Sequence, residues 1–145
     1  MPCLTAYPKV KIGMVDVDVR TLLFIQPGDL ISDYQTIHHW IVTFAHKVST
    51  MGLAVAAQKR VVVRLEARLY RSYRSSSTEK KPTEGAIKNM IILDESLQKE
   101  QDRLDAMEAE RSRYINTLNA VENKRDMIVN MGAELRNRRR KDISM

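Results

Sequence analysis

Apolar residues recur at every third or fourth position along most of this chain. Between residues 30 and 69 the spacing alternates between 4 and 3 over more than five heptads, which is the pattern of a coiled-coil seam. The pattern predicts a helix over about residues 31–73, on the order of 65 Å long at about 1.5 Å per residue. Such a helix needs a partner helix to cover its apolar face. The seam positions are Leu30, Tyr34, Ile37, Ile41, Phe44, Val48, Met51, Val55, Gln58, Val62, Leu65 and Leu69.

A second periodic segment runs from Glu95 to about residue 138, and we expect it to pair antiparallel with the first. Two successive spacings of 3 around Leu104 predict a stammer, which would locally overwind a coiled coil. At the turn, Thr83 is the expected N-cap of a short helix through about Ile92, and Asp94 is the expected cap of the second long helix. Its seam positions are Leu97, Gln101, Leu104, Met107, Arg111, Tyr114, Leu118, Val121, Arg125, Ile128, Gly132 and Leu135.

The start of the chain has a different period. From Lys9 to Arg20 the sequence KVKIGMVDVDVR alternates apolar and polar residues, which predicts one or two short strands that must dock on the helices or on another subunit. We therefore expect a mainly α fold: a long antiparallel helical hairpin with a short helix at its turn and a short N-terminal β segment. The expected domains are a strand-like extension over residues 1–28 and a helical domain over 29–145.

Composition agrees with one folded unit. The chain has 145 residues, 43% of them hydrophobic and 29% charged, with only 5 Gly and 4 Pro. The lone Cys3 cannot form an intrachain disulfide, and no run of about eighteen apolar residues is present, so we expect a cytosolic protein without a membrane segment. Polar residues within the seam, such as Gln58 and Arg111, are typical of positions that fix the register of a homo-oligomer.

Positive charge is concentrated in two places. The net charge is +6, and residues 59–81 alone hold eight basic and two acidic side chains, whereas residues 82–135 hold seven basic and eleven acidic ones. The last ten residues hold five basic groups and one acidic group. This distribution favours a polyanionic partner or an acidic protein surface.

The basic residues of the first segment follow a helical spacing. Arg60, Arg64, Arg68 and Arg71 are 4, 4 and 3 apart, so they form one ridge that avoids the predicted seam. Tyr70 and Tyr73 lie beside the ridge near the end of the helix. We expect the nucleic-acid-binding residues to be Lys59, Arg60, Arg64, Arg68, Tyr70, Arg71, Tyr73, Arg74, Lys80 and Lys81, together with Arg138, Arg139 and Arg140 of the basic tail.

Two interpretations of this ridge remain open. Arginines can neutralise the backbone of a single DNA strand while tyrosines stack on its bases, without sequence readout. Alternatively the arginines are paired with acids of the second helix, within the hairpin or across subunits. The protein would then be a structural or adaptor coiled coil, such as a virion or scaffold component, without DNA affinity. The acids concerned are Glu100, Asp102, Asp105, Glu108 and Glu110.

Catalytic motifs are missing from the sequence. There is no P-loop, dinucleotide-binding loop, CxxC or HExxH motif, so we expect no enzyme activity and no cofactor. His38, His39 and His46 lack a further metal ligand nearby in sequence, and we expect them at the surface or packed. Asp16 and Asp18 share one strand face, which we interpret as a solvated polar face and not as a metal site.

Four segments carry a likeness to a known family. They are AAQKRVVVRLEARLYRSYR (Ala56–Arg74), the upstream Trp40, TEGAIKNMIILDESLQ (Thr83–Gln98) and NKRDMIVNMGAELRNRR (Asn123–Arg139). Together these segments, over roughly residues 30–140, resemble the UvsY-like recombination mediator proteins of tailed phages. The family's basic-Ala-Arg-Leu-aromatic signature falls on residues 66–70, where Glu66 replaces the basic residue and Arg68 is retained.

The resemblance implies a small accessory protein of DNA recombination and repair in the host cell cytoplasm. Such a protein binds single-stranded DNA, helps displace the single-strand-binding protein and loads a RecA-like recombinase. It also implies homo-oligomers built as rings or barrels of helical subunits. The strand-like segment from Lys9 to Arg20 looks like an addition to the family pattern.

Overall fold

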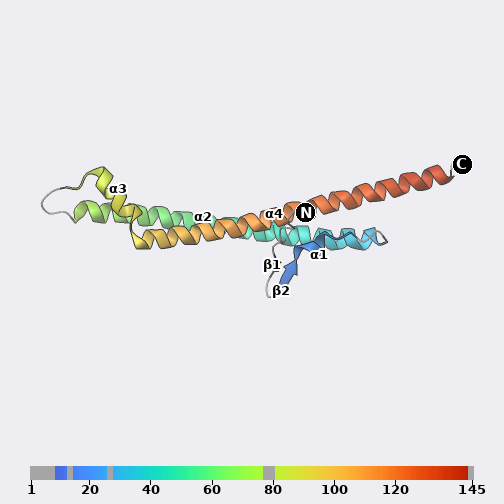
Figure 1. The fold of residues 1–145 in the computed structure, drawn as a ribbon, viewed down its shortest axis with the longest axis horizontal. Helices are drawn as coiled ribbons and strands as arrows, with labels where there is room; N and C mark the ends of the chain where they lie inside the picture. The colour runs from blue at the N-terminus through green and yellow to red at the C-terminus, as the bar shows by residue number, and fades with distance from the viewer. Residues whose placement is uncertain (1–8, 13–14, 26–27, 77–80, 144–145) are drawn as a thin grey trace, which may run out of the picture. The chain divides into compact units, whose positions relative to one another are not determined.

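The computed structural model describes residues 9–12, 15–25, 28–76 and 81–143. It confirms a mainly helical chain in which a long helix pairs with a later helix and a short β segment precedes both (Figure 1). The elements are β1 (Lys9–Ile12), β2 (Val15–Asp18), α1 (Val19–Leu23), α2 (Leu30–Ser75), α3 (Glu84–Ile92) and α4 (Glu95–Ile143).

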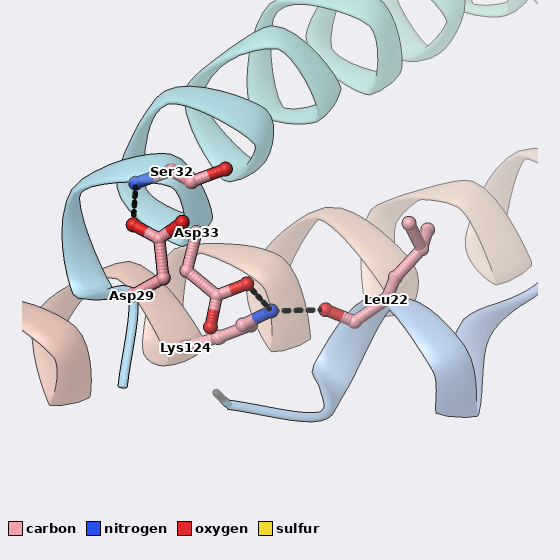
Figure 2. A network of polar contacts seen from close by, with 5 residues as sticks. All are labelled: Leu22, Asp29, Ser32, Asp33 and Lys124. Atoms are coloured by element: carbon pink, nitrogen blue, oxygen red, sulfur yellow. Dashed lines mark hydrogen bonds and ion pairs between the residues drawn. The ribbon is translucent and has the colours of Figure 1, made fainter. Parts of the chain in front are cut away.

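The ends of α2 follow from local hydrogen bonding. Asp29 caps its first turn, since the Asp29 carboxylate accepts from the Ser32 amide at 3.1 Å (Figure 2). At the other end, the hydroxyl of Ser75 donates to the Ser72 carbonyl at 3.0 Å, and that of Ser76 to the Tyr73 carbonyl at 3.3 Å. The Ser72 carbonyl also accepts from the Ser76 amide at 3.0 Å, so the serine hydroxyls add side-chain hydrogen bonds to the last turn, where the helix ends.

The two predicted caps at the turn are confirmed. The Thr83 hydroxyl accepts from the Ala86 amide at 3.3 Å at the start of α3. The Asp94 carboxylate accepts from the Ser96 amide at 3.0 Å and from the Leu97 amide at 3.3 Å at the start of α4. The predicted end of α4 near residue 138 was too early, because the helix continues to Ile143.

The chain divides into two compact units, and both long helices contribute to each. We call Ser49–Arg111 the turn unit, and Met1–Val48 with Ser112–Met145 the terminal unit. The predicted division at residue 28 stays a prediction.

In the turn unit, the end of α2 packs antiparallel against the start of α4. Buried Val55 and Val62 of α2 meet buried Leu97 and Leu104 of α4. Half-buried residues complete this core: Leu65 and Leu69 of α2, Ile91 of α3, and Met107 of α4. Figure 1 shows α3 beside the end of α2 and the start of α4, where Ile91 joins the core.

The predicted stammer is wrong, because the prediction placed the wrong residue in the seam. Gln101 is exposed, whereas Glu100 is half-buried and its carboxylate accepts from the Gln58 side-chain amide at 2.6 Å. With Glu100 in the seam, spacing through Leu97, Glu100 and Leu104 to Met107 is 3, 4 and 3, the ordinary coiled-coil alternation. A hydrogen bond to buried Gln58 explains why a carboxylate takes this position.

In the terminal unit, the first half of α2 packs against the second half of α4. The core contains Val19 of α1, Ile37 and Phe44 of α2, and Tyr114, Val121 and Ile128 of α4. The Phe44 ring is stacked on Trp40 at 5.8 Å between centroids and lies 6.4 Å from the Tyr114 ring. The seam prediction is wrong at Tyr34 and Leu135, which are exposed.

The β-hairpin docks on the helices, which was one of the two predicted alternatives; the other was docking on another subunit. β1 and β2 are antiparallel, with Lys9 opposite Asp18 and Ile12 opposite Val15. The Tyr114 hydroxyl of α4 donates to the Lys11 carbonyl at 2.6 Å. This bond gives a hairpin that would not be stable alone an attachment to α4.

Two polar residues of α4 are buried, although the prediction placed the residues that follow them in the seam. Thr117 and Lys124 are buried, whereas Leu118 and Arg125 of the predicted seam are half-buried. The Thr117 hydroxyl donates to the Arg113 carbonyl one turn earlier, at 2.9 Å, so its polar group is satisfied within the helix.

Lys124 is the more informative case, and Figure 2 shows its surroundings. Its ammonium donates to the Leu22 carbonyl at 2.7 Å and lies 3.6 Å from the Asp33 carboxylate. A buried lysine is retained here because it satisfies an orphan carbonyl at the end of α1 and pairs with an acid in the first turn of α2. One side chain of α4 thus links α1, α2 and α4 within the terminal unit.

Candidate nucleic-acid interface

The four-residue arginine ridge (Arg60, Arg64, Arg68 and Arg71) lies on the outer face of α2 in the turn unit. The inner face is fixed by Val55 and Val62, which are buried against α4. Arginines at these positions point away from that contact, and all four are exposed. The ridge is therefore accessible in the single chain, as the seam pattern predicted.

Among the residues that the structure describes, no arginine of the ridge forms an ion pair with a carboxylate. Arg60 donates through Nε to the Ala56 carbonyl one turn earlier, at 3.3 Å. Like charges one turn apart destabilise a helix by about 0.2–0.5 kcal/mol per pair. The turn unit thus carries a row of mutually repelling cations that no carboxylate of the described residues neutralises.

The acids of α4 that were considered as partners have other contacts or face solvent. Glu108 forms an ion pair with Lys59 at 2.7 Å, and Glu100 accepts from Gln58. Lys59 is a predicted binding residue, and its charge is therefore paired with an acid of α4. Asp102, Asp105 and Glu110 are exposed.

The two tyrosines near the end of α2 have different surroundings. The half-buried Tyr73 donates its hydroxyl to the Asp94 carboxylate at 2.7 Å, which ties the end of α2 to the cap of α4. The hydrogen bond to Asp94 raises the pKa of the Tyr73 hydroxyl. Hydrogen bonds from the Ser96 hydroxyl and then from Tyr73 lower the pKa of the Asp94 carboxyl, against the smaller effect of desolvation.

Tyr70 lies one turn before Arg74 on α2. The Arg74 guanidinium stands 6.0 Å from the centre of the Tyr70 ring and donates to its hydroxyl at 3.4 Å. This arrangement places a cation beside an aromatic face, in the geometry of a weak cation–π contact. Tyr70 is half-buried, so part of its ring remains accessible.

A groove between α2 and α3 runs beside the ridge and was not predicted from the sequence. We call it the α2–α3 groove; its volume is about 490 Å³. A signal for it exists in the sequence, because Val63 and Ala67 are apolar positions outside the seam, spaced one turn apart. The lining residues are Val63, Glu66, Ala67, Tyr70, Lys88, Ile91 and Ile92.

The basic tail belongs to the terminal unit, where Arg138, Arg139 and Arg140 are exposed on the last turns of α4. These residues are helical, because α4 continues to Ile143. Arg138 borders a small hollow of about 200 Å³ together with Met131, Glu134 and Leu135. Of the two loop lysines, Lys81 is exposed and Lys80 lies outside the described residues.

The histidines of α2 and the aspartates of β2 were predicted not to form metal sites. His38, His39 and His46 are exposed on α2, and His39 contacts the edge of Trp40. Asp18 caps α1 by accepting from the Arg20 amide at 2.9 Å. The part of the chain that the structure describes holds no group of three His, Cys, Asp or Glu side chains arranged to bind a metal ion.

By length and composition, α2 also satisfies a simple criterion for crossing a membrane. An eighteen-residue window within it reaches a mean hydropathy of 1.2 and is 11% buried. A mostly buried core helix of a soluble protein and a signal sequence satisfy the same criterion, so this is weak support for a membrane span.

No protein-family model, curated protein or solved structure matches this chain. The resemblance to UvsY-like mediators therefore stays a hypothesis based on the residues quoted above.

Proposed function

We propose that this protein is a single-stranded DNA-binding recombination mediator. The observation that supports the proposal is the arginine ridge, which is exposed and lacks carboxylate partners within the described chain. A DNA backbone supplies the negative charge that the ridge lacks. Arg74 and Lys81 continue the positive charge beyond the ridge, and Tyr70 offers an aromatic face beside it.

A single strand fits this surface better than a duplex. The binding energy would come from neutralised phosphates and released counterions, together with bases that stack on an aromatic side chain. Duplex readout needs an element that enters a groove and side chains that pair with base edges. A row of arginines along one helix supplies backbone contacts without such readout, which suits binding to any sequence.

The mediator step rests on the resemblance. In the host cell cytoplasm, such a protein would bind a single strand, help displace the single-strand-binding protein from it and load a RecA-like recombinase in its place. We also propose that the chain acts as a homo-oligomer, which would align the ridges of several copies along one strand. Neither activity requires catalytic residues or a cofactor.

The alternative is a structural or adaptor coiled coil in which acids of another copy cover the ridge. It predicts no measurable DNA affinity, and it predicts that loss of the arginines changes the assembled mass. The pair between Lys59 and Glu108 shows that acids of α4 can reach α2 in this hairpin. Both predictions can be checked with one set of variants.

The test replaces Arg64, Arg68 and Arg71 by alanine and measures binding of a labelled oligodeoxythymidine by fluorescence anisotropy at constant salt. Alanine favours helix, so the circular dichroism spectrum should be retained. The matched control removes three exposed basic residues of α4: Lys99, Arg103 and Arg113. Binding should be strongly weakened in the first variant and largely kept in the control. Equal affinities for both variants would refute the ridge, and native mass would then report whether assembly changed.

A further inference from the structure

We infer that the α2–α3 groove is a docking site for DNA bases, so that a bound strand places its phosphates on the arginine ridge and its bases in the groove. This inference rests on the proposed function and deepens it. It assigns a second, apolar contact to the same strand. The occupant is a nucleobase of single-stranded DNA.

The first argument is the placement of the groove next to the ridge. Each of the three apolar or aromatic α2 residues in the groove is followed in sequence by an arginine of the ridge. Successive residues of a helix are about 100° apart, so groove and ridge are neighbouring stripes along one helix. The pairs are Val63–Arg64, Ala67–Arg68 and Tyr70–Arg71.

The second argument is the chemistry of the lining. The lining includes the apolar side chains of Val63 and Ile92, which are 62% and 64% exposed, and the aromatic Tyr70. Exposed apolar side chains beside a row of cations match a ligand that is itself part apolar and part anionic. A single strand has that character, because flat bases alternate with charged phosphates along it.

The third argument is the polarity within the groove. Glu66 and Lys88 are its two charged lining residues, and they provide an acceptor and a donor. A carboxylate repels phosphate but accepts hydrogen bonds from a base amino group, as from cytosine N4. The Glu66 carboxylate therefore favours bases on the groove side, and it gives a role to the acid that replaces a basic residue of the family signature.

A larger hollow nearby does not compete for this role. It has a volume of about 750 Å³ and lies at the start of α4, beside Tyr73. Asp94 and Glu95 contribute two acidic residues to its lining, and the Tyr73 hydroxyl is already bonded to Asp94. These carboxylates would repel phosphates, and no basic residue among those described lines this hollow, whereas Lys88 lines the α2–α3 groove.

The test compares an oligodeoxycytidine with a strand of the same length made of abasic sites. Both carry the same phosphates, so only the first can use the groove. Base stacking is worth about 1–3 kcal/mol per base, so the abasic strand should bind at least about fivefold more weakly to the unmodified protein. Anisotropy titrations at one salt concentration give the ratio of the two affinities, oligodeoxycytidine over the abasic strand.

Variants locate the difference in the groove. Ala67→Leu fills the groove on an exposed helical position and should move the ratio towards one, whereas Ala106→Leu on α4 is the matched control and should leave the ratio unchanged. Tyr70→Leu should lower the ratio, and Tyr70→Phe should keep it because the ring remains. Circular dichroism confirms that each variant is helical.

Each outcome decides the inference. A ratio that falls in Ala67→Leu and Tyr70→Leu alone supports base docking. Equal, salt-sensitive binding of both strands overturns base docking while leaving the proposed function in place. Failure of both strands to bind refutes the proposed function and the inference with it. A change of native mass in Ala67→Leu with an unaltered ratio means that the groove holds protein, which also overturns the inference.

Discussion

The salt dependence of DNA binding measures how many ridge arginines contact phosphates. For single strands, the logarithm of the binding constant falls with the logarithm of salt concentration by about 0.7 per neutralised phosphate. Four ridge arginines and Arg74 are exposed on the same part of α2, so we expect them to contribute about 3.5 to this slope. Raising salt from 50 to 200 mM would then weaken this contribution about 100-fold.

Replacing Arg64, Arg68 and Arg71 by alanine should lower the slope by about 2, because three phosphate contacts are removed. The same fourfold rise in salt should then weaken the remaining α2 contribution by only about sevenfold. Anisotropy titrations at four or five salt concentrations give the slopes directly. A slope that falls as much in the Lys99, Arg103 and Arg113 control would show that net charge, and not the ridge, governs binding. A slope unchanged in the ridge variant would refute the phosphate contacts.

Three further predictions concern the scaffold. Phe44→Ala should reduce the free energy of unfolding by about 3–5 kcal/mol in urea titrations, because Phe44 is 0% exposed between two aromatic rings; a loss below about 1 kcal/mol would contradict that packing. Lys124→Met should cost about 1–3 kcal/mol, because the Leu22 carbonyl loses its donor, and a cost near zero would show that solvent replaces the ammonium. The pKa of Asp94 is lowered in the folded state, so its stabilisation is present above its unfolded pKa, near 4, and is lost as pH falls through the lower folded pKa. Wild type should therefore lose more stability than Asp94→Asn below about pH 4 in acid titrations followed by circular dichroism, and parallel curves would contradict the assignment.

The helical elements were predictable from sequence because their signals are local. Apolar spacing identified both long helices, and the side chains of Thr83 and Asp94 marked helix starts to the residue. The exposure of the arginine ridge followed from the same spacing, since a residue outside the seam of a paired helix faces solvent. The predicted helix ends were less accurate. α4 continues through a basic segment, because basic side chains interact favourably with the negative C-terminal end of the helix dipole.

Polar members of the core could not be ranked from sequence. Gln101 and Glu100 are adjacent and both polar, and the choice between them depends on which one meets Gln58 across the hairpin. Lys124 is buried because the Leu22 carbonyl and the Asp33 carboxylate converge on it, and neither neighbour is close to it in sequence. The α2–α3 groove was missed for a related reason: its second wall comes from α3, whose docking the pattern did not specify.

The polar seam residue also explains how the ridge is held outward. Coiled-coil contacts between aliphatic side chains tolerate small shifts in register, whereas a buried amide must meet its partner or lose a hydrogen bond. Gln58 donates to both the carbonyl and the carboxylate of Glu100, at 3.2 and 2.6 Å, two residues before the ridge begins. Rotation of α2 by one residue, about 100°, would break both bonds and turn apolar Val61 towards α4 in place of Val62. A residue in the core therefore orients the surface that we propose binds DNA. Gln58→Leu should loosen that orientation even in a hairpin that is as stable as the wild type.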